Sequence, residues 1–404
     1  MDFRDTPEEV EFRAGLREWI AENLPDGWAE RKHSAGRDEE EVSRAWSKKL
    51  YDGGYAGLTW PKEYGGAGAP YTHQAIFLEE TARAETPEHI GVIGLGMAGP
   101  TIIVHGTDEQ KQKHLSKILS GEDVWCQGFS EPGSGSDLAS LRTKAVRDGD
   151  QFVVSGQKVW SSFAHIAGWC ILMTRTDTDA PKHKGITYML VDMHSPGIEV
   201  RPLRQITGDP EFNEIFFTDV RVPIDNVLGE INGGWGVGMT TLMHERGTLG
   251  FALTARLEIQ LRKLIALAKE TKQTSGSSRR DAEQTSSTAA DDPLVRDRLA
   301  QQWIELQALR FTNYRALTGL MKTGVPGPEG SIAKLHWSES NQRLTKLALE
   351  ILGPQAQLDG DDGVWNGFWQ YHQLRSRGNT IEAGTSEVLR NIVAERVLGL
   401  PKSR

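Results

Sequence analysis

Residues 126–137 read CQGFSEPGSGSD, and residues 156–162 read GQKVWSS. The first stretch predicts an extended segment, residues 124–129, that leads into a tight loop in which Ser130, Ser134 and Ser136 supply hydroxyl groups. The glycines of this loop let the backbone approach a ligand closely and turn its N–H groups outward. The loop therefore suits a ligand that carries an anionic group.

The second stretch predicts a β-hairpin. Apolar residues alternate over 152–154, Ser155-Gly156 makes the turn, and residues 158–162 form the return strand. Trp160 and Ser162 are two residues apart, so they are expected to share one face of that strand. A flat aromatic side chain and hydroxyls near a Gly/Ser loop favour a large cofactor with a flat ring and an anionic tail. The alternative is an ordinary turn beside a buried tryptophan, which a single Gly-x-Gly motif more often indicates.

Composition and charge exclude several classes of protein. The 404-residue chain carries a net charge of −9, which argues against general nucleic-acid binding because such binding needs a basic face. Its two cysteines, Cys126 and Cys170, support neither a disulfide framework nor a cysteine metal site, so a reducing compartment and no metal are expected. The uncharged run 89–106 contains glycines and Pro100, which make it a poor membrane span. No targeting signal is visible, and we expect a soluble cytoplasmic protein.

The spacing of apolar residues divides the chain into three parts. The period is close to that of a helix over residues 1–123, close to two over 124–232, and helical again over 233–404. These ranges predict an N-terminal helical domain, a middle β domain and a C-terminal helical domain, and hence an α+β fold. Helices are expected at 12–24, 42–50, 72–83, 108–119, 235–269, 293–321, 331–352 and 386–398, and further strands at 171–174, 186–191, 198–202 and 214–217. Residues 271–292 are rich in Ser and Thr and are expected to form a mobile loop.

Both opening stretches resemble signatures of one protein family. SEPGSGSD at residues 130–137 resembles the first signature of the acyl-CoA dehydrogenase flavoproteins, and KVWSS at residues 158–162 resembles the second. Further resemblances lie at residues 57–61 (GLTWP), 64–66 (YGG), 213–223 (NEIFFTDVRVP) and 380–396 (TIEAGTSEVLRNIVAER). The resemblance covers essentially the whole chain. It implies the family's fold: a helical N-terminal domain, a β-barrel-like middle domain and a C-terminal four-helix bundle.

The resemblance also implies a cofactor, a reaction and partners. The cofactor is FAD, and the reaction is the α,β-desaturation of an acyl-CoA thioester, in which a carboxylate removes the α-proton while the β-hydrogen leaves as hydride to flavin N5. The electron acceptor is an electron-transfer flavoprotein or a similar protein, and a homo- or hetero-oligomer, dimer or tetramer, is expected. The residues expected to bind the cofactor are Gln127, Phe129, Ser130, Gly135, Ser136, Trp160, Ser161, Ser162, Gly353, Thr385 and Glu387. The residues expected to bind the substrate are Met97, Ser136 and Gly384.

Two glutamates compete for the role of catalytic base. Most of the family has a glutamate directly before a Gly-Thr pair, but Ala383 occupies that position here. Glu382 lies one residue earlier, and a one-residue shift in an extended segment would turn its side chain to the opposite face. Branched-chain and long-chain members instead use a glutamate followed by arginine on the helix after the β domain, which corresponds to Glu245 and Arg246. Glu245 is therefore the expected base, and Ala383 keeps a role through its backbone N–H, which can donate to the thioester carbonyl.

Glu245 also has a purely structural interpretation. It could be a helix-surface residue that pairs with His244 or Arg246. Adjacent residues on a helix do not face each other, so that pairing would be weak. A carboxylate in a largely apolar helical stretch is costly unless it is functional or paired, which favours the catalytic role.

Two departures from the family concern the part of the site that serves a neighbouring subunit. Lys272 stands near the position of an arginine that holds a neighbour's FAD diphosphate, and it lacks the bidentate geometry of arginine. Glu350 opens an altered motif, residues 350–354, and a carboxylate is unfavourable beside a diphosphate. This pattern, together with residues 94–97 and 181–185, resembles the heteromeric acyl-CoA dehydrogenases of steroid side-chain breakdown. Three functions stay open: a catalytic dehydrogenase, a subunit that completes a related chain's site without turnover, and a flavin oxidase or monooxygenase on the same fold.

Overall fold

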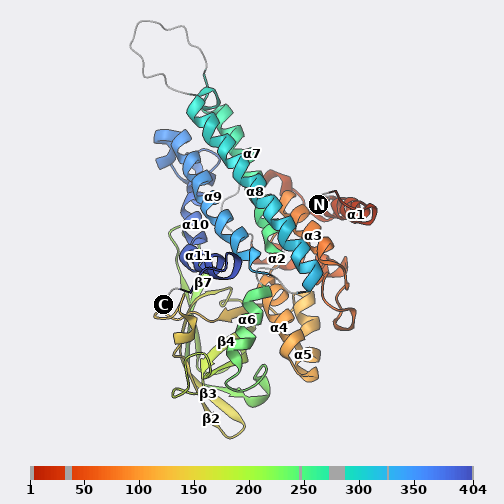
Figure 1. Cartoon of the computed structure of the whole chain (residues 1–404), viewed down its shortest axis with the longest axis vertical. Coiled ribbons are helices and arrows are strands. Elements are labelled where there is room, and N and C mark those ends of the chain that lie inside the picture. The colour runs from red at the N-terminus through yellow and green to blue at the C-terminus, as the bar shows by residue number, and fades with distance from the viewer. Residues whose placement is uncertain (1–3, 32–38, 245–247, 273–286, 325–326, 403–404) are drawn as a thin grey trace. The chain divides into compact units, whose positions relative to one another are not determined.

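The computed structural model of the chain describes residues 4–31, 39–244, 248–272, 287–324 and 327–402. These residues group into two compact units. The bundle unit comprises Met1–Gly36, Ala75–Thr86 and Thr248–Arg404, and the sheet unit comprises Arg37–Gln74 and Pro87–Gly247. The α+β composition expected from the sequence is confirmed (Figure 1).

The sheet unit combines all the described strands with short helices. Its main helices are α2 (Glu40–Asp52), α4 (Gly99–His105), α5 (Asp108–Ser120) and α6 (Gly234–His244), and a π-helical turn at Gly94–Ala98 leads into α4. Its strands are β1 (Trp125–Gly128), β2 (Lys144–Asp148), β3 (Gln151–Ser162), β4 (Trp169–Arg175), β5 (Ile186–Asp192), β6 (Ile198–Leu203) and β7 (Phe212–Pro223). Within the described ranges they form one sheet in the order β1-β4-β2-β3-β7-β6, with β5 paired to β4. The strands predicted at 124–129, 171–174, 186–191, 198–202 and 214–217 are confirmed in approximate place as β1, β4, β5, β6 and β7. Strand β2 was not predicted, and β3 differs from the prediction.

The hairpin predicted at Ser155-Gly156 is wrong. Strand β3 runs without a turn from Gln151 to Ser162, and its hairpin partner is the preceding strand β2, with Asp148 opposite Gln151. Gly156 instead lies at a shift in the register between β3 and β7. A Cβ atom on Gly156 would lie 2.7 Å from the Cα atom of Thr143, so this glycine permits a close backbone approach rather than a reversal of the chain.

A second irregularity in β3 changes where the site residues point. Lys158 pairs with Ile215 and Ser161 pairs with Asn213, so β3 contains one extra residue between these pairs. This bulge interrupts the alternation of the strand, since Lys158 and Val159 are both buried. The break precedes Trp160, and burial alternates again from the exposed Trp160 through the buried Ser161 to the half-buried Ser162, so the expectation that Trp160 and Ser162 share a face stays a prediction.

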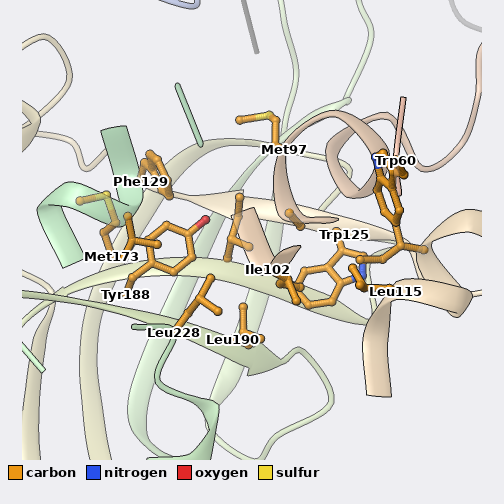
Figure 2. Packing of buried hydrophobic residues seen from close by; sticks show 14 of the residues in the cluster. Trp60, Met97, Ile102, Leu115, Trp125, Phe129, Met173, Tyr188, Leu190 and Leu228 are labelled. Carbon is orange, nitrogen blue, oxygen red and sulfur yellow. The ribbon is translucent and has the colours of Figure 1, made fainter. Parts of the chain in front are cut away.

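A buried apolar cluster joins the sheet to the helices of the same unit. Trp125 on β1 and Tyr188 on β5 pack together with Met97, Ile102 and Leu115 from the π-helical turn, α4 and α5 (Figure 2). Burial of each large apolar side chain contributes about 1.5–3 kcal/mol, so this cluster holds β1 and β5 against the helices. Met97 and Ile102 belong to the uncharged run 89–106, which therefore supplies part of this buried cluster.

The bundle unit is helical. Its helices are α1 (Pro7–Asn23), α3 (Tyr71–Arg83), whose first turn belongs to the sheet unit, α7 (Leu249–Glu270), α8 (Pro293–Thr323), α9 (Glu329–Leu352), α10 (Phe368–Asn379) and α11 (Ser386–Ile392). Helices α7, α8, α9 and α10 lie side by side as a bundle (Figure 1), and their apolar faces meet in one core with Leu264, Leu309, Leu344 and Trp369 at its centre. The single helix predicted at 235–269 is two helices, α6 and α7, and α10 was not predicted.

Helix ends in the bundle unit follow local sequence rules. Asp292 accepts a hydrogen bond from the Leu294 N–H at the start of α8, which Pro293 opens, and Gly324 ends the helix with φ 71°. The predicted mobile loop has ordered ends, because Lys272 and Thr288 form an isolated β-bridge. Residues 273–286 of that loop lie outside the described residues. Across the described helices, none has the length and apolar character needed to span a membrane.

Candidate active site

The Gly/Ser loop of the sheet unit is tied to β3 by a buried ion pair. The Nζ atom of Lys158 lies 2.9 Å from the Oε1 atom of Glu131 and also donates to the Phe129 carbonyl at 3.0 Å. The two carboxylate oxygens of Glu131 accept the N–H groups of Arg142 (2.6 Å) and Thr143 (2.8 Å). The ion pair thus connects both family signatures with the start of β2.

In both residues of this pair, burial and the pairing shift the pKa in opposite directions. Burial alone would raise the pKa of the Glu131 carboxyl, but the Lys158 charge and the hydrogen bonds from Lys158 and Thr143 outweigh it and lower that pKa below its usual value. Burial lowers the pKa of Lys158, and Glu131 opposes that shift. Both residues belong to the sequence motifs, but their pairing was not predicted from the sequence.

The residues predicted to bind the cofactor around this loop divide into structural and accessible groups. The Phe129 side chain is buried and packs edge to face on Tyr188, and the Ser130 carbonyl accepts the Val159 N–H at 2.9 Å. The Ser134 hydroxyl is turned inward and donates to the Asp137 carbonyl at 2.8 Å, contrary to the expectation that it faces a ligand. The accessible positions are Gly133, Gly135 and Ser136, and a Cβ atom on either glycine would meet no atom within 4 Å.

Trp160 is the most unusual residue of the predicted site. Its side chain is 60% exposed, and its φ of 61° lies in the left-handed region, which is rare for a bulky residue. Its indole contacts Phe212 edge to face. The next residue, Ser161, is buried, and its hydroxyl has no hydrogen-bond partner within the described part of the chain. Ser162 is half-buried and ends β3, and Gln127 on β1 is also half-buried.

A buried arginine that sequence analysis missed fixes the exit of the loop. The guanidinium of Arg175 donates to the carbonyls of Ala139 (2.6 Å), Lys182 (2.9 Å) and Leu141 (3.4 Å). It therefore joins residues just after the Gly/Ser loop to the segment around Lys182, whose Nζ pairs with Asp137 at 2.8 Å. No periodicity in the sequence indicates an arginine that binds carbonyl groups.

The second predicted region lies in the bundle unit, between α10 and α11. Residues 380–385 form a turn and not the extended segment assumed above. The Glu382 carboxylate pairs with Arg375 at 2.9 Å and accepts the Asn379 amide at 2.7 Å. The geometric reason given against Glu382 as base is therefore wrong. The structure supplies a different one, because both carboxylate oxygens of Glu382 already accept hydrogen bonds from Arg375 and Asn379.

Two of the other predicted residues of the bundle unit line an open cavity of about 520 Å³. Its wall includes Thr385, whose hydroxyl caps α11 through the Val388 N–H, and Glu387. The cationic residues of the wall are Arg343, Lys346, Arg377 and Arg390. Ala383, with φ 51°, and Gly384 belong to the turn beside it. Gly353, at the end of α9, is not among the lining residues.

The remaining predictions from the sequence concern Glu350, the catalytic base and the two cysteines. Glu350, expected to disturb a diphosphate, pairs with Arg298 on α8 and lies near Lys346. The predicted base Glu245 and its neighbour Arg246 lie outside the described residues. Cys126 and Cys170 are buried and free, and no group of side chains in the described ranges could hold a metal ion.

Helix α6, which precedes Glu245, is fixed by a buried hydroxyl network. The Thr241 hydroxyl lies 2.9 Å from that of Thr101 on α4 and 3.1 Å from that of Tyr188 on β5. Burial raises the pKa of Tyr188, so its hydroxyl stays protonated. At the end of α6, burial and the nearby His105 lower the pKa of His244.

Models of known protein families match the N-terminal, middle and C-terminal parts of the chain. Models of the N-terminal, middle and C-terminal domains of acyl-CoA dehydrogenases match residues 6–122, 126–220 and 232–398. The acyl-CoA dehydrogenase IpdE1 of Mycobacterium tuberculosis is 42% identical over 398 residues, which cover 97% of this chain and 98% of that protein. The corresponding IpdE1 of Mycolicibacterium smegmatis is 41% identical over 406 residues, 97% of this chain and 98% of that protein.

Solved structures give the same result. The Tcur3481-Tcur3483 steroid acyl-CoA dehydrogenase superposes with a TM-score of 0.85 at 34% identity, covering all of both chains. The ChsE4-ChsE5 complex from Mycobacterium tuberculosis gives a TM-score of 0.85 at 32% identity, again over the whole of both chains. Members of this family are flavoproteins that oxidise acyl-CoA thioesters. The chain described here belongs to the acyl-CoA dehydrogenase family.

Proposed function

We propose that the protein is an FAD-dependent acyl-CoA dehydrogenase that desaturates a CoA ester at its α and β carbons. The observation that carries this proposal is Trp160, an exposed indole held in a left-handed backbone conformation. A bulky residue in that conformation persists only where the surrounding structure or the function requires it. Ser162, two residues further on, is only half-buried. An exposed aromatic surface and a nearby hydroxyl fit a flat ring with polar edge atoms.

The anionic part of FAD also has fitting residues. In the sheet unit, the open backbone at Gly133 and Gly135 and the exposed Ser136 suit close approach of a diphosphate. In the bundle unit, Lys346 and Arg377 line the cavity beside Thr385, and Arg377 is bonded to the uncharged Gln373 side chain. When bound, FAD supplies the acceptor for the hydride that leaves the β-carbon. The chain's own residues bind and orient the substrate and move the α-proton.

Glu245 is proposed as the group that takes the α-proton, and this assignment rests on the sequence. The competing Glu382 is disfavoured because its two oxygens are engaged by Arg375 and Asn379. An α-proton beside a thioester is weakly acidic, so the carbonyl oxygen must be stabilised as negative charge develops on it. The backbone N–H at Ala383 is proposed for that role. The base and the hydrogen-bond donor, which one residue combines in most of the family, would then be separate residues.

The substrate class and the assembly are proposed from the relatives. Two of the matched structures are the Tcur3481-Tcur3483 steroid acyl-CoA dehydrogenase and the ChsE4-ChsE5 complex, each named for two chains. We infer that this chain acts on a CoA ester from steroid degradation and works as an oligomer, with an electron-transfer flavoprotein as the acceptor. A second, related subunit would supply the diphosphate-binding arginine that Lys272 replaces.

Stopped-flow reduction of the flavin under nitrogen tests the function and the base together. A set of CoA esters, including steroid-derived ones, is mixed with the purified protein, with and without a co-expressed related subunit. One ester should bleach the flavin band near 450 nm, whereas the free acid should not. Glu245→Gln should slow the bleaching by at least about 10²-fold and leave ester binding intact, since it removes basicity but keeps size.

Glu382→Gln is the matched control and should have a much smaller effect on the rate. If Glu382→Gln stops the reduction and Glu245→Gln does not, the two roles are reversed. If neither variant matters although the flavin is bleached, a subunit other than this chain performs the reaction. Bleaching by free acids but not by CoA esters would indicate an oxidase on the same fold.

A further inference from the structure

Lys334 on α9 carries a buried positive charge that the proposed reaction does not yet use. The residue is 7% exposed, and its Nζ atom donates to the carbonyls of Asn379 and Gly384, both at 2.8 Å. An ammonium group is costly to bury unless its hydrogen bonds are made. These two bonds connect α9 with the end of α10 and with the turn before α11.

The turn that Lys334 holds has a strained backbone. Ala383 has φ 51° and Gly384 has φ 94°, so two successive residues lie at positive φ. For a residue with a Cβ atom this region costs about 1–2 kcal/mol, and an unrestrained turn would relax from it. The two carbonyls that bind Lys334 stand on either side of Ala383 in the sequence. The ammonium therefore clamps the segment that contains the strained residue.

Side chains add a second restraint to the same turn. The side-chain amide nitrogen of Asn379 donates to Glu382 at 2.7 Å. The side-chain carbonyl oxygen of Asn379 accepts a hydrogen bond from the Asn341 side-chain amide at 2.9 Å. Arg375 holds the other oxygen of Glu382 at 2.9 Å. Asn341 and Lys334 both lie on α9, so this helix fixes the turn through backbone and side chains. Within the described part of the chain, the N–H groups of Gly384 and Thr385 donate to no acceptor.

We propose that Lys334 is a positioning residue for the thioester carbonyl of the substrate. It keeps the turn at Ala383 in the conformation in which the N–H groups of Gly384 and Thr385 can donate to that oxygen. Its buried charge also favours the negative charge that the oxygen gains as the α-proton leaves, because preorganised charges act strongly where water is excluded. This inference rests on the proposed function, and it deepens the part assigned to Ala383.

The test compares Lys334→Met with Lys322→Met, a lysine on the exposed surface of α8. The probe is the CoA ester that bleaches the wild-type flavin, as its 3-thia analogue with ¹³C at the thioester carbonyl. Infrared difference spectra report how far the carbonyl band moves to lower wavenumber on binding, a readout that does not require turnover. Removing the ammonium should at least halve this shift and slow flavin reduction about 10²-fold, with the Kd of the analogue changed less than about threefold. Lys322→Met should behave as the wild type.

Three outcomes would overturn the inference. A Lys334→Met variant with wild-type band shift and rate would show that the ammonium does not act on the carbonyl. If Lys334→Met loses FAD, loses analogue binding and unfolds at a lower urea concentration, Lys334→Gln, which keeps an N–H donor group without the charge, is measured in its place. A folded Lys334→Gln variant with the wild-type band shift would overturn the inference. If the wild type binds no CoA ester, the proposed function fails first, which is a distinct result.

Discussion

Replacing Lys158 by methionine should destabilise the sheet unit and release the FAD that we propose it binds. The substitution keeps the length of the side chain and removes the ammonium that pairs with Glu131 and binds the Phe129 carbonyl. Lys158 is fully buried and the Glu131 side chain is 8% exposed, so solvent screens the pair very little. Breaking a buried ion pair by removing one partner typically costs about 3–5 kcal/mol, because the other charge stays buried without its partner.

The ion pair Lys182–Asp137 provides a matched control in the same unit. Both of its side chains are more than half exposed, at 53% and 59%, and exposed pairs contribute at most about 1 kcal/mol. Lys182→Met should therefore change the stability little. The double variant Lys158→Met with Glu131→Gln leaves no buried charge unpaired, so Glu131→Gln should cost less in that background than in the wild type.

Urea unfolding, followed by tryptophan fluorescence and far-ultraviolet circular dichroism, gives the free energy of unfolding of each variant. Gel filtration gives the fraction of FAD retained.

The contribution of Glu131 to the free energy of unfolding has a defined pH dependence. Its pKa in the fold is lowered, so its stabilisation is present above the unfolded value of about 4.3 and is lost as the pH falls through the folded pKa. A Lys158→Met variant that loses less than about 1 kcal/mol, or no more than Lys182→Met, would refute the view that this pair fixes the Gly/Ser loop.

Two further predictions concern residues that the sequence interpreted wrongly or left unused. Gly156→Ala should lower the free energy of unfolding by about 1–3 kcal/mol in the same urea assay, because its Cβ atom would lie 2.7 Å from the Thr143 Cα atom. Gly149→Ala is the control: Gly149 has φ 65°, and a Cβ atom there would meet no atom within 4 Å. This variant should show only the smaller cost of a left-handed backbone. Burial lowers the pKa of His372 to about 4. Below about pH 6.5 the unfolded chain therefore binds a proton at this histidine that the folded chain does not bind, so the fold loses stability as the pH falls. His372→Phe should remove about 2 kcal/mol of the stability lost between pH 7 and pH 5, and equal pH profiles of stability for variant and wild type would contradict this.

The sequence predicted those parts of the fold that depend on local signals. The helix predicted at 293–321 is α8, whose start carries a local signal in Pro293 after a capping Asp292, and the β domain was found from its two-residue period. The length of β3 was not found, because Ser155-Gly156 is as compatible with a bulge as with a turn. The choice between them depends on pairing with β7, which is a long-range contact. Local signals carry no information about such pairing.

The candidate site shows the same division. The family signatures indicated which residues gather around the Gly/Ser loop, but not which face a ligand. Ser134 is turned inward by a hydrogen bond to Asp137, and Trp160 is turned outward by an extra residue in its strand. Arg175 and Lys334 were missed because their partners are backbone carbonyls, which every sequence possesses. Charged residues that bind carbonyl groups leave no complementary charge in the sequence by which they could be found.

The surroundings of Glu382 bear on how the family's two catalytic roles could separate in this chain. A glutamate at position 383 would provide both the base and the backbone donor from one left-handed residue. With alanine there, the carboxylate next to it is fixed by Arg375 and Asn379 and serves to hold the turn. The N–H groups of the turn then keep their geometry without a reactive side chain. Such a turn is useful only if a base acts from elsewhere, so the ordered backbone around Ala383 favours a catalytic site with its base on another element over a turn that has lost its function.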